Sequence, residues 1–220
     1  MLLLTERLII LLIDQRRGRI EKSSSDLIFY GLPSAIIIDL EMLNLIKIRD
    51  DNKIEIISSE TTHPIFKSII EEMQNEHEND IRFWIRSLGI KSNQILESFI
   101  EVMLQDGILT KIEKRFLFFK RRKIFCTEES VKIELMHQLQ ETIINSKKAT
   151  MHTKLLLAIL YKCNKITLCL NKGLNEMLLN EVREEIRDEK FGEIITELIR
   201  ERNELMNAIF STYLINTSLV

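Results

Sequence analysis

The chain has 220 residues, of which 45% are hydrophobic and 29% are charged, the balance of an ordinary globular protein with a sizeable core. A formal net charge of −2 excludes a protein drawn onto nucleic acid or acidic lipid by its overall field, so any such binding requires a local basic patch. The chain contains only 2 prolines and 6 glycines, which favours helices over a β fold with many turns.

The first predicted element is a short apolar helix over residues 6–14. Glu6 and Arg7 split the apolar run at the N-terminus, the other charges follow it, and no small-residue cleavage site appears. We therefore expect a buried helix and no targeting segment. A turn follows at residues 15–19, in which Gly18 supplies a position with positive φ.

The next stretch, residues 26–45, has a helical pattern that contains Gly31-Leu32-Pro33. Proline lacks an amide donor and clashes with the preceding turn, so a kink or break is expected there. Two runs rich in β-formers then surround a polar turn, which predicts a small hairpin. Its strands would be residues 46–49 and 53–57.

Three helices are expected in the following stretch, at residues 63–74, 80–88 and 92–104. Pro64 suits the first turn of the first helix, and Gly89 is a natural C-cap for the second. The third helix has apolar residues at helical spacing. Three short strands are then expected, at residues 108–112, 116–119 and 123–126.

A helix over residues 127–146 leads to the segment around which we expect the fold to be organised, residues 153–170. This segment is apolar at every position from 155 to 161, and a helix that is apolar all round must be covered on all sides. Polar residues interrupt it well before the ~20 apolar residues that a membrane crossing needs. Two more helices are expected after it, near residues 180–190 and from 193 onwards.

These elements predict one mostly α domain over residues 1–220. Its about eight to ten helices would pack around a buried central apolar helix, with a few short β-hairpin strands.

No catalytic constellation, metal site or cofactor motif is apparent, so we predict a protein that is not an enzyme. No histidine forms a zinc-protease motif, and neither a P-loop nor a Gly-x-Ser-x-Gly elbow occurs. The 3 cysteines lack zinc spacing, which favours buried free thiols and a reducing, cytosolic compartment.

Two basic clusters remain. Residues 111–123 combine lysines and arginines with phenylalanines, as the strands of a winged-helix nucleic-acid binder would. We favour a hairpin with a solvated edge, because the net charge is not basic and no recognition helix precedes the strands. The second cluster is Lys147, Lys148 and Lys154, around the start of the central helix. On its own it is best interpreted as a surface turn.

Five collinear segments resemble the Golgi phosphoprotein 3 family. They are LLLTERLIILLIDQRRGRI (2–20), DLIFYGLPSAIIIDLEMLNLI (26–46), FWIRSLG (83–89), VMLQDGILTKIEKRFLFF (102–119) and MHTKLLLAILYKCNK (151–165). The resemblance implies a mostly α fold around a buried central helix. It also implies a non-enzymatic peripheral membrane protein that binds phosphatidylinositol 4-phosphate and docks proteins, as eukaryotic members do when they help to retain Golgi glycosyltransferases.

The headgroup site that the resemblance implies uses a tryptophan and an arginine on the second helix and two basic residues at the start of the central helix. In this chain those positions are Ser24, Pro33, Thr150 and Thr153. Charge-assisted contacts dominate tight recognition of a multiply charged headgroup, so a weaker and less selective site for anionic lipid is expected. The candidate lipid-binding residues are Ser24, Lys147, Lys148, Thr150, Thr153 and Lys154.

The resemblance also implies self-association through the segment after the central helix, here residues 171–179, although packing within the same subunit explains that segment equally well. The implied location is the cytoplasm and a membrane periphery, on the cytosolic face of the Golgi in a eukaryote. Two alternatives stay open: an interaction scaffold that has lost lipid binding, and the less favoured winged-helix nucleic-acid binder.

Overall fold

The computed structural model describes residues 2–21, 25–116, 119–144, 150–168 and 200. In this part of the chain the fold is mostly α, as predicted, with three antiparallel strand pairs. The α-helices are α1 (Leu4–Leu12), α2 (Leu32–Met42), α3 (Pro64–Asn75), α4 (Ile81–Ile90), α5 (Ser92–Gln105), α6 (Glu129–Ile144) and α7 (Met151–Lys162). These described helices are slightly fewer than predicted, and the two helices expected after residue 180 lie outside the described residues.

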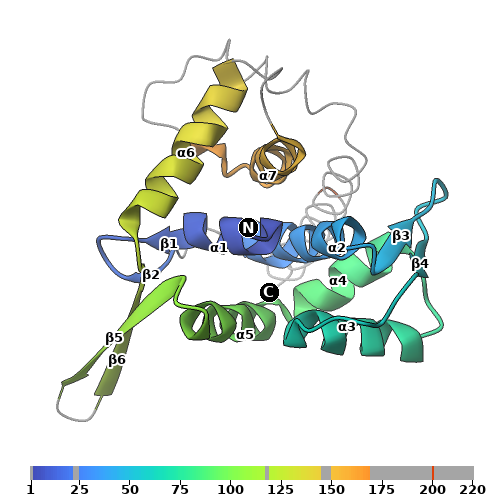
Figure 1. The fold of residues 1–220 in the computed structure, drawn as a ribbon, viewed down its shortest axis with the longest axis horizontal. Helices are drawn as coiled ribbons and strands as arrows, with labels where there is room; N and C mark the ends of the chain where they lie inside the picture. Colours follow the sequence, from blue (N-terminus) through green and yellow to red (C-terminus); the bar gives the residue numbers. More distant parts are fainter. Residues whose placement is uncertain (1, 22–24, 117–118, 145–149, 169–199, 201–220) are drawn as a thin grey trace, which may run out of the picture.

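The helices form three layers (Figure 1). Helices α1 and α2 lie in the middle layer, with α6 and α7 on one side and α3, α4 and α5 on the other. Both faces of the middle layer are covered, so α1 and α2 are apolar almost all round. The core therefore runs through all three layers as one cluster.

Helix α7 confirms the prediction of a buried central helix. Every residue from Leu155 to Leu160 is buried, and the helix contacts α1, α2 and α6. The predicted extension to residue 170 is wrong, because α7 ends at Lys162. Asn164 adopts a positive φ of 54°, a left-handed conformation that ends a helix, and a short 3-10 helix follows at Ile166–Leu168.

The N-terminal helix is shorter at its C-terminal end than predicted. Its last residues instead form strand β1 (Ile13–Asp14), which pairs with β2 (Arg19–Ile20) around the predicted turn. Gly18 has the expected positive φ, 64°. The Gly18 carbonyl accepts a hydrogen bond of 2.9 Å from the Ile124 amide, so the turn lies directly on a later strand.

The break predicted at Gly31-Leu32-Pro33 is a change of helix type. Residues Leu27–Gly31 form a π-helical turn, in which the Leu32 amide donates to the Leu27 carbonyl, and α2 continues from it. Pro33 has no amide hydrogen, so it cannot continue the ladder of the preceding turn. The Ser34 hydroxyl donates to the Tyr30 carbonyl at 2.6 Å and satisfies one carbonyl of that turn.

The first predicted hairpin is confirmed as β3 (Ile46–Ile48) and β4 (Ile54–Ile56). The prediction of three strands between residues 108 and 126 is wrong, because two strands of 8 residues pair along their whole length. They are β5 (Leu109–Phe116) and β6 (Phe119–Cys126), and the segment interpreted as a separate strand includes the last residue of β5 and the first of β6. Short breaks in the sequence pattern do not interrupt a ladder when its partner strand continues.

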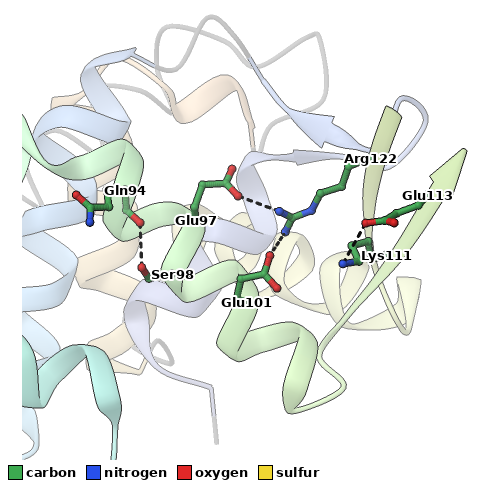
Figure 2. A network of polar contacts seen from close by, with 7 residues as sticks. All are labelled: Gln94, Glu97, Ser98, Glu101, Lys111, Glu113 and Arg122. Carbon is green, nitrogen blue, oxygen red and sulfur yellow. Dashed lines mark hydrogen bonds and ion pairs between the residues drawn. The ribbon is translucent and has the colours of Figure 1, made fainter. Parts of the chain in front are cut away.

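Arg122 attaches the long hairpin to α5 (Figure 2). Its Nη1 lies 3.0 Å from Glu97 Oε2 and its Nη2 lies 2.9 Å from Glu101 Oε1. Lys111 pairs with Glu113 on β5 at 3.2 Å. Carboxylates of this chain thus meet the charges of Lys111 and Arg122, which supports the interpretation of a solvated hairpin over a nucleic-acid surface.

Candidate functional site

The start of α7 is closed by two threonines. Thr150 is the N-cap, and its hydroxyl oxygen accepts a hydrogen bond of 3.3 Å from the Thr153 amide. The two hydroxyl oxygens lie 2.8 Å apart and share a hydrogen bond. This is the usual geometry of a threonine cap, in which a side chain satisfies one of the amides that a helix leaves unpaired in its first turn.

The structure describes three of the six predicted lipid-binding residues. Thr150 is exposed, Thr153 is only 3% exposed, and Lys154 is half-buried. Both threonine hydroxyls are engaged in the cap, so their visible role is to shape the start of α7. The other three, Ser24, Lys147 and Lys148, lie outside the described residues.

Pro33 occupies the position that carries an arginine in the resembled family. It is buried in the first turn of α2. Neither its apolar ring nor its burial allows it to contribute a charge to a site on the surface.

The charge of Arg7, on α1, acts on His152 at this end of α7. His152 is half-buried in the first turn of α7, and Arg7 is half-buried in α1. Burial lowers the pKa of His152, and the positive charge of Arg7 lowers it further, while Asp39 opposes both effects. The two side chains are therefore close enough to interact electrostatically.

Arg7 is held by the backbone. Its Nε donates to the Leu2 carbonyl at 3.3 Å. Among the described residues, no carboxylate lies within ion-pair distance of its guanidinium. A half-buried guanidinium bonded to a neutral carbonyl keeps its remaining donors for an anion.

Two buried carboxylates lie close by and are already engaged with α1. Asp39, on α2, is 2% exposed and accepts hydrogen bonds from the amides of Leu4 and Thr5, each at 2.8 Å. Glu6 accepts from the Leu3 amide at 2.9 Å. Burial raises the pKa of both carboxyls, and their mutual repulsion raises that of Glu6 further.

The arrangement favours an anionic ligand. The carboxylates accept hydrogen bonds from the amides of α1, whereas His152 belongs to the first turn of α7, which carries a partial positive charge, and the charge of Arg7 acts on it. His152 gains a full charge as the pH falls.

Sequence reasoning did not include Arg7 and His152 among the site residues. His152 had a local signal, because it lies between Thr150 and Thr153. Arg7 had none, since its effect on His152 arises only once α1 packs against α7.

The described residues show no sign of a metal centre or a membrane crossing. No group of three His, Cys, Asp or Glu side chains in this part of the chain could hold a metal ion. None of the described helices combines the length and apolar character needed to cross a bilayer.

The sequence matches a known protein family over most of its length. The family model described as Golgi phosphoprotein 3 (GPP34) matches residues 4–202. No curated protein matches the sequence.

Proposed function

Because the chain belongs to the Golgi phosphoprotein 3 family, we propose that it is a peripheral membrane protein that binds anionic lipid headgroups and docks partner proteins. Membership confirms the resemblance carried by the collinear segments. The proposed headgroup site lies at the start of α7, and it uses Arg7 and His152 together with Lys154. Lys147 and Lys148 precede α7 in the chain and add two positive charges to this stretch of the sequence.

One observation carries this proposal: the half-buried guanidinium of Arg7, whose charge lowers the pKa of His152, donates to a backbone carbonyl and has no carboxylate partner among the described residues. A guanidinium that has lost part of its hydration is stabilised by an anionic partner, through charge-assisted hydrogen bonds. A phosphate group placed there would supply the counterion. Its position also agrees with the resemblance, which puts the family's basic residues at the start of this helix.

Such a site would be less selective than one with several arginines. Three cationic side chains and a helix N-terminus can attract a phosphate, but with a single arginine they offer few bidentate contacts to distinguish one phosphorylated headgroup from another. We therefore propose a preference for anionic lipid in general, with phosphoinositides bound because of their higher charge.

Co-sedimentation with liposomes tests the proposal. Neutral, generically anionic and phosphatidylinositol 4-phosphate vesicles are compared at low salt for wild type, Arg7→Gln and His152→Gln. Each basic group near a membrane surface contributes about 1 kcal/mol, so Arg7→Gln should weaken binding about fivefold or more. The loss caused by His152→Gln should increase as the pH falls below 6.5, the ordinary pKa of histidine.

Lys67→Gln is the matched control. Lys67 is exposed on α3, in the layer on the opposite side of α1 and α2 from α7 (Figure 1). The Lys67→Gln substitution removes one positive charge, as Arg7→Gln does, and should leave binding unchanged.

A second variant, carrying Lys147→Ala, Lys148→Ala and Lys154→Ala, measures how much the three lysines contribute to membrane binding.

Binding that drops in the triple lysine variant but not in Arg7→Gln would contradict the proposed composition of the site. Failure to bind any membrane would contradict the lipid half of the proposal and leave an interaction scaffold. Self-association through residues 171–179 stays a prediction, because that segment lies outside the described residues.

A further inference from the structure

A groove runs between the start of α1 and the first turns of α6. Its volume is about 590 Å³, within the range of small-molecule sites. Apolar side chains supply most of its lining: Leu2 from the start of the chain, and Val131, Ile133 and Leu135 from α6. Ile133 is 61% exposed, so the groove opens to solvent beside an apolar side chain.

Arg7 belongs both to this groove and to the proposed headgroup site. It lines the groove, and its charge acts on His152 at the start of α7. Arg7 is thus shared by the two features, and an apolar groove adjoins this cation. This polarity suits one acyl chain of a lipid with an anionic head.

The remaining polar lining agrees with a neutral tail. Glu134 lies on the wall of the groove, and its carboxylate disfavours a second anionic group there. A groove of similar size, about 630 Å³, lies between α3 and α5, but there Lys91 is already paired with Glu72. That groove lacks a cation available to an anionic head.

We propose that the groove between α1 and α6 receives one acyl chain of the anionic lipid whose headgroup binds beside Arg7 and His152. This inference rests on the proposed function. The bound lipid would then be held at both ends, with its phosphate on the guanidinium and part of one chain against Val131 and Leu135. Each methylene that leaves water contributes favourably to binding, so affinity would depend on chain length.

Soluble lipids separate the two halves of this site. Dibutanoyl and dioctanoyl phosphatidylinositol 4-phosphate carry the same headgroup and differ only in chain length. Titration calorimetry below the micelle concentration measures the affinity of each for wild type. The dioctanoyl lipid should bind at least about tenfold more tightly, because even two additional buried methylenes would produce that factor.

Ser130→Trp blocks the groove without touching the headgroup site. Ser130 is exposed in the first turn of α6 and lines the groove. The indole should remove the chain-length effect and leave the affinity for the dibutanoyl lipid unchanged. Ser98→Trp is the matched control, since Ser98 is exposed on α5 and lines the groove between α3 and α5. It should keep the full chain-length effect.

Each result decides the proposal. Equal affinity of wild type for both lipids, with measurable binding, would overturn the acyl-chain groove and leave the headgroup site standing. A chain-length effect that survives in Ser130→Trp would also overturn the groove. Absence of binding to either lipid would overturn the groove and the proposed function together.

Discussion

Asp39 caps the helix that contains Thr5. Its Oδ2 accepts hydrogen bonds from the Thr5 amide at 2.8 Å and from the Thr5 hydroxyl at 2.6 Å. The other carboxylate oxygen accepts from Leu4 at 2.8 Å. A buried acid on α2 therefore satisfies amides that α1 would otherwise leave unpaired in the core.

Asp39→Asn should lower the free energy of unfolding by about 2–3 kcal/mol, because the amide group replaces one acceptor oxygen with a donor that faces donors. Thr5→Val removes only the hydroxyl bond and should cost about 1 kcal/mol. Urea unfolding followed by circular dichroism measures both. Glu71→Gln, at an exposed position on α3, is the control and should change little. Equal losses for the two variants would argue against Asp39 as a cap.

Lys132→Met should also destabilise the fold, by about 2 kcal/mol. The Lys132 ammonium donates to the carbonyls of Leu11, at 3.2 Å, and Ile13, at the other end of α1. Methionine keeps the apolar stem but removes the donor. Lys67→Met supplies an exposed control with the same change of side chain. Comparable midpoints for Lys132→Met and wild type in urea would contradict the role of this lysine.

Gly89→Ala tests a close approach between α4 and the π-helical turn. An added Cβ would lie 2.6 Å from the Phe29 carbonyl oxygen and 2.9 Å from its ring. Alanine normally stabilises a helix interior by about 1 kcal/mol relative to glycine. Here the clash should reverse that sign and cost about 1–3 kcal/mol in thermal or urea unfolding. A gain in stability would show that the two elements separate easily.

His63 should make stability depend on pH. Its Nδ1 accepts from the Phe66 amide at 3.4 Å, and its ring stacks on Phe66 at 4.3 Å, so only the neutral form can cap α3. Burial lowers its pKa below the ordinary 6.5, although Asp106 partly opposes this. As the pH falls, His63 is therefore protonated at a higher pH in the unfolded chain than in the folded protein. The stabilisation is complete above pH 6.5 and is lost as the pH falls toward the folded pKa.

His63→Asn keeps a cap acceptor but does not titrate in this range. Between pH 7 and pH 5 wild type should lose stability relative to this variant, by about 1.4 kcal/mol for each unit of pKa shift. Parallel stability curves over that range would contradict the expectation.

The class of fold could be predicted from the sequence because apolar spacing and breakers act locally. The turn at Gly18, the break at Pro33 and the buried run of α7 were predicted on that basis. Gly89 shows the limit. A glycine after an apolar run predicts a C-cap, but here it lies inside α4, where the contact with Phe29 makes a small residue necessary. Such a need exists only after folding.

The candidate site shows the same limit more strongly. Its charged residues come from α1 and α7, which are more than one hundred residues apart in the chain. The family resemblance directed attention to the start of α7 as the place of a headgroup site. Threonines stand where the resemblance implies basic residues, so the local sequence does not indicate which residues would bind the headgroup. The proposed contribution of Arg7 depends on the packing of α1 against α7, which the sequence pattern does not contain.

The capping of α1 from both ends has a consequence for synthesis. Asp39 satisfies its first amides and Lys132 satisfies its last carbonyls. A ribosome makes the N-terminal end first, so α1 emerges long before its second partner exists. Of the described helices, α1 is made before the others and is thus completed only after Lys132, more than one hundred residues later, has left the exit tunnel.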